Sequence, residues 1–140
     1  MLDDIFALHT LIHLPIFGGR ARTQPEERRL SGLLRRLAPQ GIGAQMSPPS
    51  AQVTTLVTGS GSVYPVSIEA ISLAGFCVAV GVLVKAEESV LVRAAADGVD
   101  YVFPCQVLWV DKSRVGLALI ALPRMEAAVE HRRLAVAAGS

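Results

Sequence analysis

The sequence predicts a mainly β fold: a six-stranded antiparallel barrel with an N-terminal helical extension and a C-terminal helix. Short apolar runs with alternating polar residues recur between residues 53 and 120, and turn residues separate them. In the segments on either side of this range, apolar residues recur every three to four positions, which is the spacing of a helix face. Six strands at such short spacing favour a small closed barrel. We therefore assign residues 1–50 to a helical extension and linker, 51–122 to the barrel, and 123–140 to a C-terminal helix and tail.

Length and charge restrict the classes of function. With 140 residues the chain suits one domain, which buries about two thirds of the surface that the unfolded chain exposes. Its formal net charge of +1 gives no bulk attraction for nucleic acid. An acidic ligand would therefore have to meet a local basic cluster.

The sequence also indicates where the protein works. No apolar run approaches the roughly 18 to 20 residues of a membrane-spanning helix, and the acidic N-terminus does not resemble a signal peptide. Cys77 and Cys105 lie in apolar strand patterns without Cys-x-x-Cys spacing, which indicates two buried thiols. We expect a reducing, cytoplasmic setting.

The first predicted helix spans residues 3–14. Asp3 and Asp4 suit its positive N-terminal end, and Pro15 followed by Gly18 ends it. An apolar face that includes Ile5 runs along it. This segment is the first half of the predicted extension.

His9 and His13 lie four residues apart on one side of this helix, which is the spacing of a two-histidine metal site. No Glu follows His9 in the arrangement of a catalytic zinc site, and no third ligand is near in sequence. We therefore expect no metal here, and interpret the pair as a helix edge that faces solvent or a partner.

The second predicted helix runs from about residue 24 to residue 38 and begins with a capping box. Thr23 can cap the N–H of Glu26 while the Glu26 carboxylate bonds back. Leucines then fall on one stripe and arginines on the opposite side. The leucines suit packing on the barrel or on a second copy; the arginines are either a solvated face or a contact for phosphate or an acidic partner. The candidates for binding a protein, including a homodimer partner, are Arg28, Arg29, Leu30, Leu33, Leu34, Arg35, Arg36 and Leu37.

The barrel strands follow in order. A β-branched run at 53–57 and an alternating run at 64–70 are joined by a Gly-Ser turn into a hairpin. Gly75 has no Cβ, and we expect it to turn the chain tightly through backbone angles closed to other residues. The remaining strands are predicted at residues 76–80, 90–93, 101–110 and 115–120.

Two prolines mark special positions in the C-terminal half. Pro104 lies inside a predicted strand and belongs at an edge or bulge, since proline has no N–H for a strand ladder. Pro123 begins the predicted C-terminal helix, which continues through about Val136 with Met125 and Val129 facing inward.

Two short motifs in the barrel segment resemble the PilZ domain family. Ile71-Ser-Leu-Ala-Gly-Phe76 is similar to the strand, Ser-x-x-Gly, strand junction of that family. The Val-Leu-Trp strand that ends at Val110, followed by a strand beginning Val115-Gly116, resembles its closing hairpin. The resemblance covers residues 51–122 and implies the PilZ-like barrel.

The resemblance also implies a ligand, because PilZ domains typically bind cyclic di-GMP. They use an Arg-x-x-x-Arg pair before the first strand and an Asp/Asn-x-Ser-x-x-Gly motif at the corner. Ser72 and Gly75 match the corner motif and are the vestigial nucleotide-binding candidates. Ala70 replaces the Asp or Asn, and Glu69 would point to the other face of the strand. No two arginines are four residues apart, so we expect no physiological affinity for cyclic di-GMP.

Enzyme and nucleic-acid functions find little support in the sequence. Ser72 is in a β corner rather than a strand-to-helix elbow, and all three histidines lie in the predicted terminal helices. The aromatic residues suit the core better than a stacking platform. These aromatic residues are Phe76, Tyr101, Phe103 and Trp109.

The resemblance therefore implies a bacterial, cytoplasmic signalling adaptor of the PilZ type, without catalysis, cofactor or metal. It would act through protein partners in motility or surface-organelle regulation. The alternatives are a cyclic di-GMP receptor with a non-standard site, in which helix arginines replace the missing clamp, and a self-associating structural module.

Overall fold

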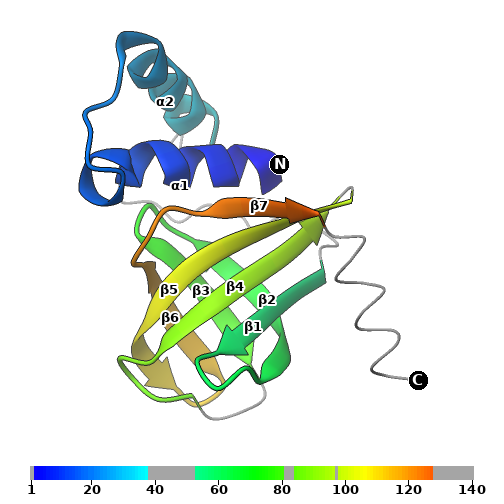
Figure 1. Ribbon diagram of the computed structural model, residues 1–140. Helices are drawn as coiled ribbons and strands as arrows, with labels where there is room; N and C mark the ends of the chain where they lie inside the picture. Colours follow the sequence, from blue (N-terminus) through cyan, green and yellow to red (C-terminus); the bar gives the residue numbers. More distant parts are fainter. Residues whose placement is uncertain (1, 38–52, 81–83, 97, 128–140) are drawn as a thin grey trace.

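Two helices precede seven strands in the computed structural model, which describes residues 2–37, 53–80, 84–96 and 98–127. Figure 1 shows the helices stacked at one end of a barrel. The element bounds are α1 Leu2–Phe17, α2 Gln24–Leu37, β1 Val53–Thr58, β2 Val63–Ile71, β3 Gly75–Val80, β4 Ser89–Ala96, β5 Val99–Asp111, β6 Arg114–Leu119 and β7 Arg124–Ala127.

Six of the strands close into an antiparallel barrel, as the sequence predicts. The sheet runs β4-β1-β2-β3-β6-β5-β7, and an additional pairing of β4 with β5 completes a ring that leaves β7 outside. Closure removes the exposed edges that an open sheet of these strands would present. The interior is filled by apolar side chains from alternate positions, among them Leu56, Val78, Val92 and Phe103, all fully buried.

The long strand β5 changes partner along its length, and Pro104 lies at the change. Residues 99–102 pair with β7 on one side, whereas residues 105–111 pair with β6 on that side. Pro104 falls between the two pairings, so its missing N–H leaves no ladder bond unmade there. Its carbonyl still accepts a hydrogen bond from Ile120 N at 3.0 Å.

The predicted C-terminal helix is wrong where the structure describes it. Residues 124–127 form β7, which pairs with the first residues of β5. Met125 is 58% exposed rather than inward-facing. Ion pairs accompany this backbone pairing: the Glu126 carboxylate lies 3.2 Å from the guanidinium of Arg93 on β4, which also lies 3.6 Å from Asp100 on β5. The rest of the predicted helix, residues 128–136, lies outside the described residues.

Helix α1 lies across one end of the barrel (Figure 1). It is longer than predicted and includes Pro15, which has no N–H to bond the Leu11 carbonyl one turn earlier. The Arg22 guanidinium replaces that donor, since its Nη1 donates to Leu11 O at 2.9 Å. The helix therefore continues to Phe17 instead of ending at the proline.

Helix α2 packs on α1, and its capping box is confirmed. Thr23 N donates to the Glu26 carboxylate at 2.8 Å, and Glu26 N lies 3.4 Å from Thr23 Oγ1. Leu30 and Leu33 are buried in the same cluster as the apolar residues of α1. Of the helices that the structure describes, none has the length and apolar character to cross a membrane.

Candidate functional site

The Ser-x-x-Gly corner between β2 and β3 is closed by its own hydrogen bonds. Ser72 N donates to Gly75 O at 2.9 Å, and Gly75 N donates to Ser72 Oγ at 3.2 Å. The next carbonyl back, Ala74 O, accepts from Leu119 N at 3.0 Å, which ties the corner to β6. The polar groups of the motif thus hold the turn together.

Gly75 is required by close packing, and the turn needs no unusual backbone angle at this position. A Cβ on Gly75 would lie 2.1 Å from Leu117 O, because β6 crosses directly beside it. The glycines with positive φ among the described residues are Gly19, Gly61 and Gly98. The expected reason for Gly75, access to backbone angles closed to other residues, is therefore corrected to a steric one.

The position that resembles a guanine-reading residue carries only the Ala70 methyl group. A bulge does fall beside it, because the β2–β3 register shifts between Ile68 and Ala70 at Glu69. The Glu69 carboxylate, however, is bound by Arg114 Nε at 2.9 Å. The carboxylate at the bulge is therefore engaged in an ion pair with β6 and is not available to bind a guanine base.

The candidate residues of α2 separate into a buried and an exposed group. Leu30 and Leu33 are buried, and Leu34 and Leu37 are half-buried against the core. Arg36 is exposed and pairs with Asp4 of α1 at 2.8 Å.

Three other arginines of this helix are exposed, and within the described part of the chain no ion pair joins them to a carboxylate. They are Arg28, Arg29 and Arg35. Arg35 Nε lies only near the Ser31 carbonyl, at 3.4 Å. These three side chains, which we call the arginine face, are the part of the predicted protein-binding set that remains on the surface.

The corner residues and the arginine face belong to different parts of the structure. Ser72 and Gly75 bond within the β2–β3 corner, whereas the arginine face belongs to α2, which packs on α1. Among the described residues, no hydrogen bond or ion pair joins the corner to α2. The structure therefore describes the corner and the arginine face as two separate groups of residues.

The histidine pair of α1 is buried, which corrects the prediction of a helix edge facing solvent or a partner. The His9 ring packs on Phe76 and Phe103, at centroid distances of 5.3 and 6.0 Å. His13 stacks on His9 at 5.7 Å, and its Nδ1 lies 2.8 Å from His9 O. No cluster of three potential ligands for a metal ion occurs in the described residues. The sequence signal that this prediction missed is the presence of apolar residues on most sides of α1.

Burial changes the acid–base properties of His9. Both ring nitrogens are buried without a hydrogen-bond partner among the described residues. Loss of hydration, with a smaller contribution from His13, lowers the pKa of His9 from 6.5 to about 3. The ring is therefore neutral at physiological pH, and protonating it requires a large free energy.

Trp109 is the aromatic residue that the sequence placed wrongly in the core. Its side chain is 45% exposed, and its indole lies over Gly116, where a Cβ would come within 2.2 Å of the ring. The flat packing on a glycine explains why the Val-Gly pattern follows the tryptophan strand. The other three aromatic residues assigned to the core are buried: Phe76, Tyr101 and Phe103.

The two cysteines are poor nucleophiles. Burial raises the pKa of the Cys105 thiol to about 12, and also raises the pKa of Cys77, which is half-buried near Glu69 and Arg114. The prediction of a buried thiol is confirmed for Cys105, whereas Cys77 is only half-buried.

A groove that the sequence did not reveal lies between α1, α2 and the barrel. It has a volume of about 440 Å³. Phe6 and Thr10 of α1, Arg29 of α2, Tyr101 of β5 and Met125 of β7 lie along it. These residues are far apart in the sequence, so local periodicity gives no indication that they share a surface.

Comparison with known proteins adds no assignment. No protein-family model matches the chain, and no curated protein matches it either.

The steric role of Gly75 is tested by Gly75→Ala. The new methyl group would overlap the Leu117 carbonyl, so we expect the free energy of unfolding to fall by about 2 kcal/mol or more. Urea unfolding followed by circular dichroism measures it. Gly32→Ala is the matched control, because nothing lies within 4 Å of that added methyl group; it should stabilise the protein by about 1 kcal/mol. Equal effects at the two glycines would contradict the steric explanation.

The burial of His9 predicts a pH-dependent stability. Because the folded pKa is lower than the unfolded pKa, the unfolded state binds more protons below pH 6.5, and stability falls as the pH falls. The contribution of His9 should fall by about 2 kcal/mol between pH 7 and pH 5. Urea unfolding at each pH, compared with His9→Phe, isolates this term from the carboxylates. The same pH slope in both proteins would show that His9 is not the cause.

Proposed function

We propose that this protein is a non-catalytic signalling adaptor of the PilZ type, which binds a protein partner and not cyclic di-GMP. The setting that the motif resemblance implies is the bacterial cytoplasm, in the regulation of motility or a surface organelle. The arginine face of α2 is the surface that would meet an acidic region of the partner.

The observation that carries this proposal is the way in which α2 presents its arginines. Leu30 and Leu33 anchor one side of the helix in the core that it shares with α1. Arg28, Arg29 and Arg35 remain exposed, and no carboxylate of the described chain pairs with them. A fixed helix with arginines free of such pairs suits carboxylates on another protein, because the guanidinium donors can bind them bidentately.

The residues of the vestigial nucleotide site support the same proposal. Ser72 and Gly75 use their polar groups on each other, and Glu69 is bound to Arg114. A nucleotide at this corner would find the Ala70 methyl group and no pair of arginines spaced to hold its phosphates. The matching residues are explained by the geometry of the barrel without reference to a ligand.

Titration calorimetry with cyclic di-GMP tests the negative half of the proposal. We expect no heat of binding at micromolar concentrations of the intact chain, since the charge-assisted contacts that hold the phosphates are missing. A dissociation constant of about 1 µM or tighter would make the protein a nucleotide receptor and overturn the adaptor proposal.

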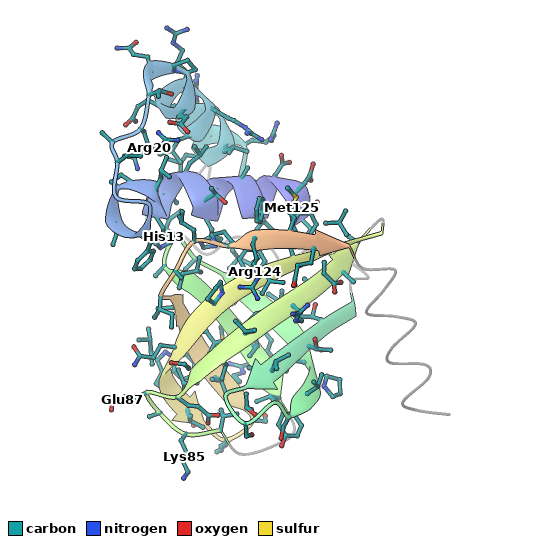
Figure 2. All side chains as sticks on the ribbon, in the orientation of Figure 1. His13, Arg20, Lys85, Glu87, Arg124 and Met125 are labelled. Atoms are coloured by element: carbon teal, nitrogen blue, oxygen red, sulfur yellow. The ribbon has the colours of Figure 1, made fainter. Side chains whose placement is uncertain are left out.

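Affinity capture from the native cells tests the positive half. The intact chain should retain a partner that the variant Arg28→Gln, Arg29→Gln, Arg35→Gln does not retain. Lys85→Gln, Lys112→Gln, Arg124→Gln is the matched control, because it removes the same charge from residues outside α2: Lys85 precedes β4, Lys112 lies between β5 and β6, and Arg124 begins β7. Figure 2 shows Lys85 and Arg124. Quantitative mass spectrometry compares the three baits. Loss of capture with both variants would indicate non-specific electrostatics and contradict a role for α2.

A further inference from the structure

We propose that the groove between α1, α2 and β7 is an anchor site that takes a large apolar side chain next to a carboxylate, both from an acidic segment of the partner. This inference rests on the proposed function and adds the chemistry of the partner. It concerns the flank of α2 on which Arg29 lies.

Part of the groove lining is held by contacts within the protein. Phe6 of α1 lines the groove and makes ring contacts with Tyr101 and Phe103, at centroid distances of 5.3 and 6.4 Å. Thr10 lines it further along α1, and its hydroxyl donates to Phe6 O at 2.8 Å. An aromatic lining that is already packed favours an apolar side chain, because little conformational entropy of the groove is lost on binding.

The lower wall of the groove is adaptable. Met125 projects from β7, the strand outside the barrel ring, and is 58% exposed. Figure 2 places it where β7 runs beneath α1. An unbranched thioether can adjust to the shape of an incoming side chain, and methionine is enriched at protein interfaces. The volume of about 440 Å³ is at the lower end of the range for binding pockets, so it suits one large side chain and its neighbours.

The charges along the groove favour an acidic occupant. Glu26 is bound by Arg20 through two contacts of 2.8 Å, which lower the pKa of its carboxyl group to about 2. The pKa of Asp3, the other carboxyl group on the groove, is also lowered, chiefly by a hydrogen bond to its side chain. Both carboxylates are therefore already engaged. Arg29 makes no ion pair in the part of the chain that the structure describes, so the unmatched charge on the groove is positive.

The opposite flank of α2 continues this basic character. Arg28 and Arg35 line a second hollow there, together with Glu27, whose carboxylate is already bound by Arg22 at 2.9 Å. Within the described residues neither arginine pairs with a carboxylate. A segment with one apolar anchor and several carboxylates could therefore occupy the groove and continue across the helix, whereas a basic or purely apolar segment would leave Arg29 without a counter-charge.

A small probe that joins an aromatic ring to a carboxylate tests the anchor site without the partner. The intact chain is titrated with phenylbutyrate and with its neutral amide, and methyl and backbone signals are followed by NMR. We expect shifts confined to the groove, including Ala7, Leu11 and Met125, with the amide binding about threefold more weakly than the acid.

Two variants separate the charge from the apolar contact. Arg29→Gln should abolish the difference between acid and amide, whereas Arg28→Gln, on the other flank, should leave it unchanged. Met125→Ser should weaken the binding of both probes by a similar factor. Because Met125 is exposed, this substitution should leave the protein folded, so weaker binding would report the lost apolar contact.

Each contrary result overturns the anchor site. The anchor site would be contradicted by NMR shifts spread over the surface, by equal binding of acid and amide to the intact chain, or by equal effects of the two arginine variants. A different result would contradict the proposed function. In that case phenylbutyrate would bind in the groove, but capture of the partner would not depend on the arginine face. Conversely, partner capture that depends on the arginines without probe binding would leave the adaptor proposal standing and remove the anchor site.

Discussion

The contact of α1 with the open end of the barrel is the constraint on which the rest of the structure depends. Aromatic rings from the helix, Phe6 and His9, pack on Phe76 and Phe103 of the strands below. This contact covers the apolar end of the barrel interior and gives α2 a surface on which to bury its leucines. It also places a histidine where its ring nitrogens are buried without a hydrogen-bond partner among the described residues, which costs free energy for the neutral ring and much more for the protonated ring.

The short motifs that resemble PilZ domains have structural explanations in this chain. Ser72 closes a turn, Gly75 allows β6 to pass, and Gly116 accepts the face of Trp109. Each of these roles is independent of a nucleotide, because it depends on a turn hydrogen bond, on the close Leu117 backbone or on the Trp109 ring. Their presence therefore says more about architecture than about ligand, and the functional proposal depends on surface chemistry instead.

That surface chemistry is unevenly distributed over the helical part of the protein. Most charged groups there have partners within the chain, such as Arg20 with Glu26 and Arg22 with Glu27. The arginine face differs because its charges have no carboxylate of the described chain to meet. The adjacent groove has apolar residues in its lining, among them Phe6 and Met125. Protein interfaces use an apolar anchor and a charged rim, which is why we propose these two neighbouring surfaces for a partner.

The sequence by itself determined the features that depend on neighbours along the chain. The alternation of β1 to β6, the capping box at Thr23 and the leucine stripe of α2 were all predicted, because turns and one-sided burial leave a local pattern. Tertiary structure decided the rest. Residues 124–127 became a strand because β5 and the guanidinium of Arg93 lie beside them, His9 was buried by the barrel, and Trp109 remained on the surface over a glycine. The groove likewise brings together four distant segments, so no periodicity could indicate it. Local order follows from spacing, whereas burial and shared surfaces depend on which segments meet in space.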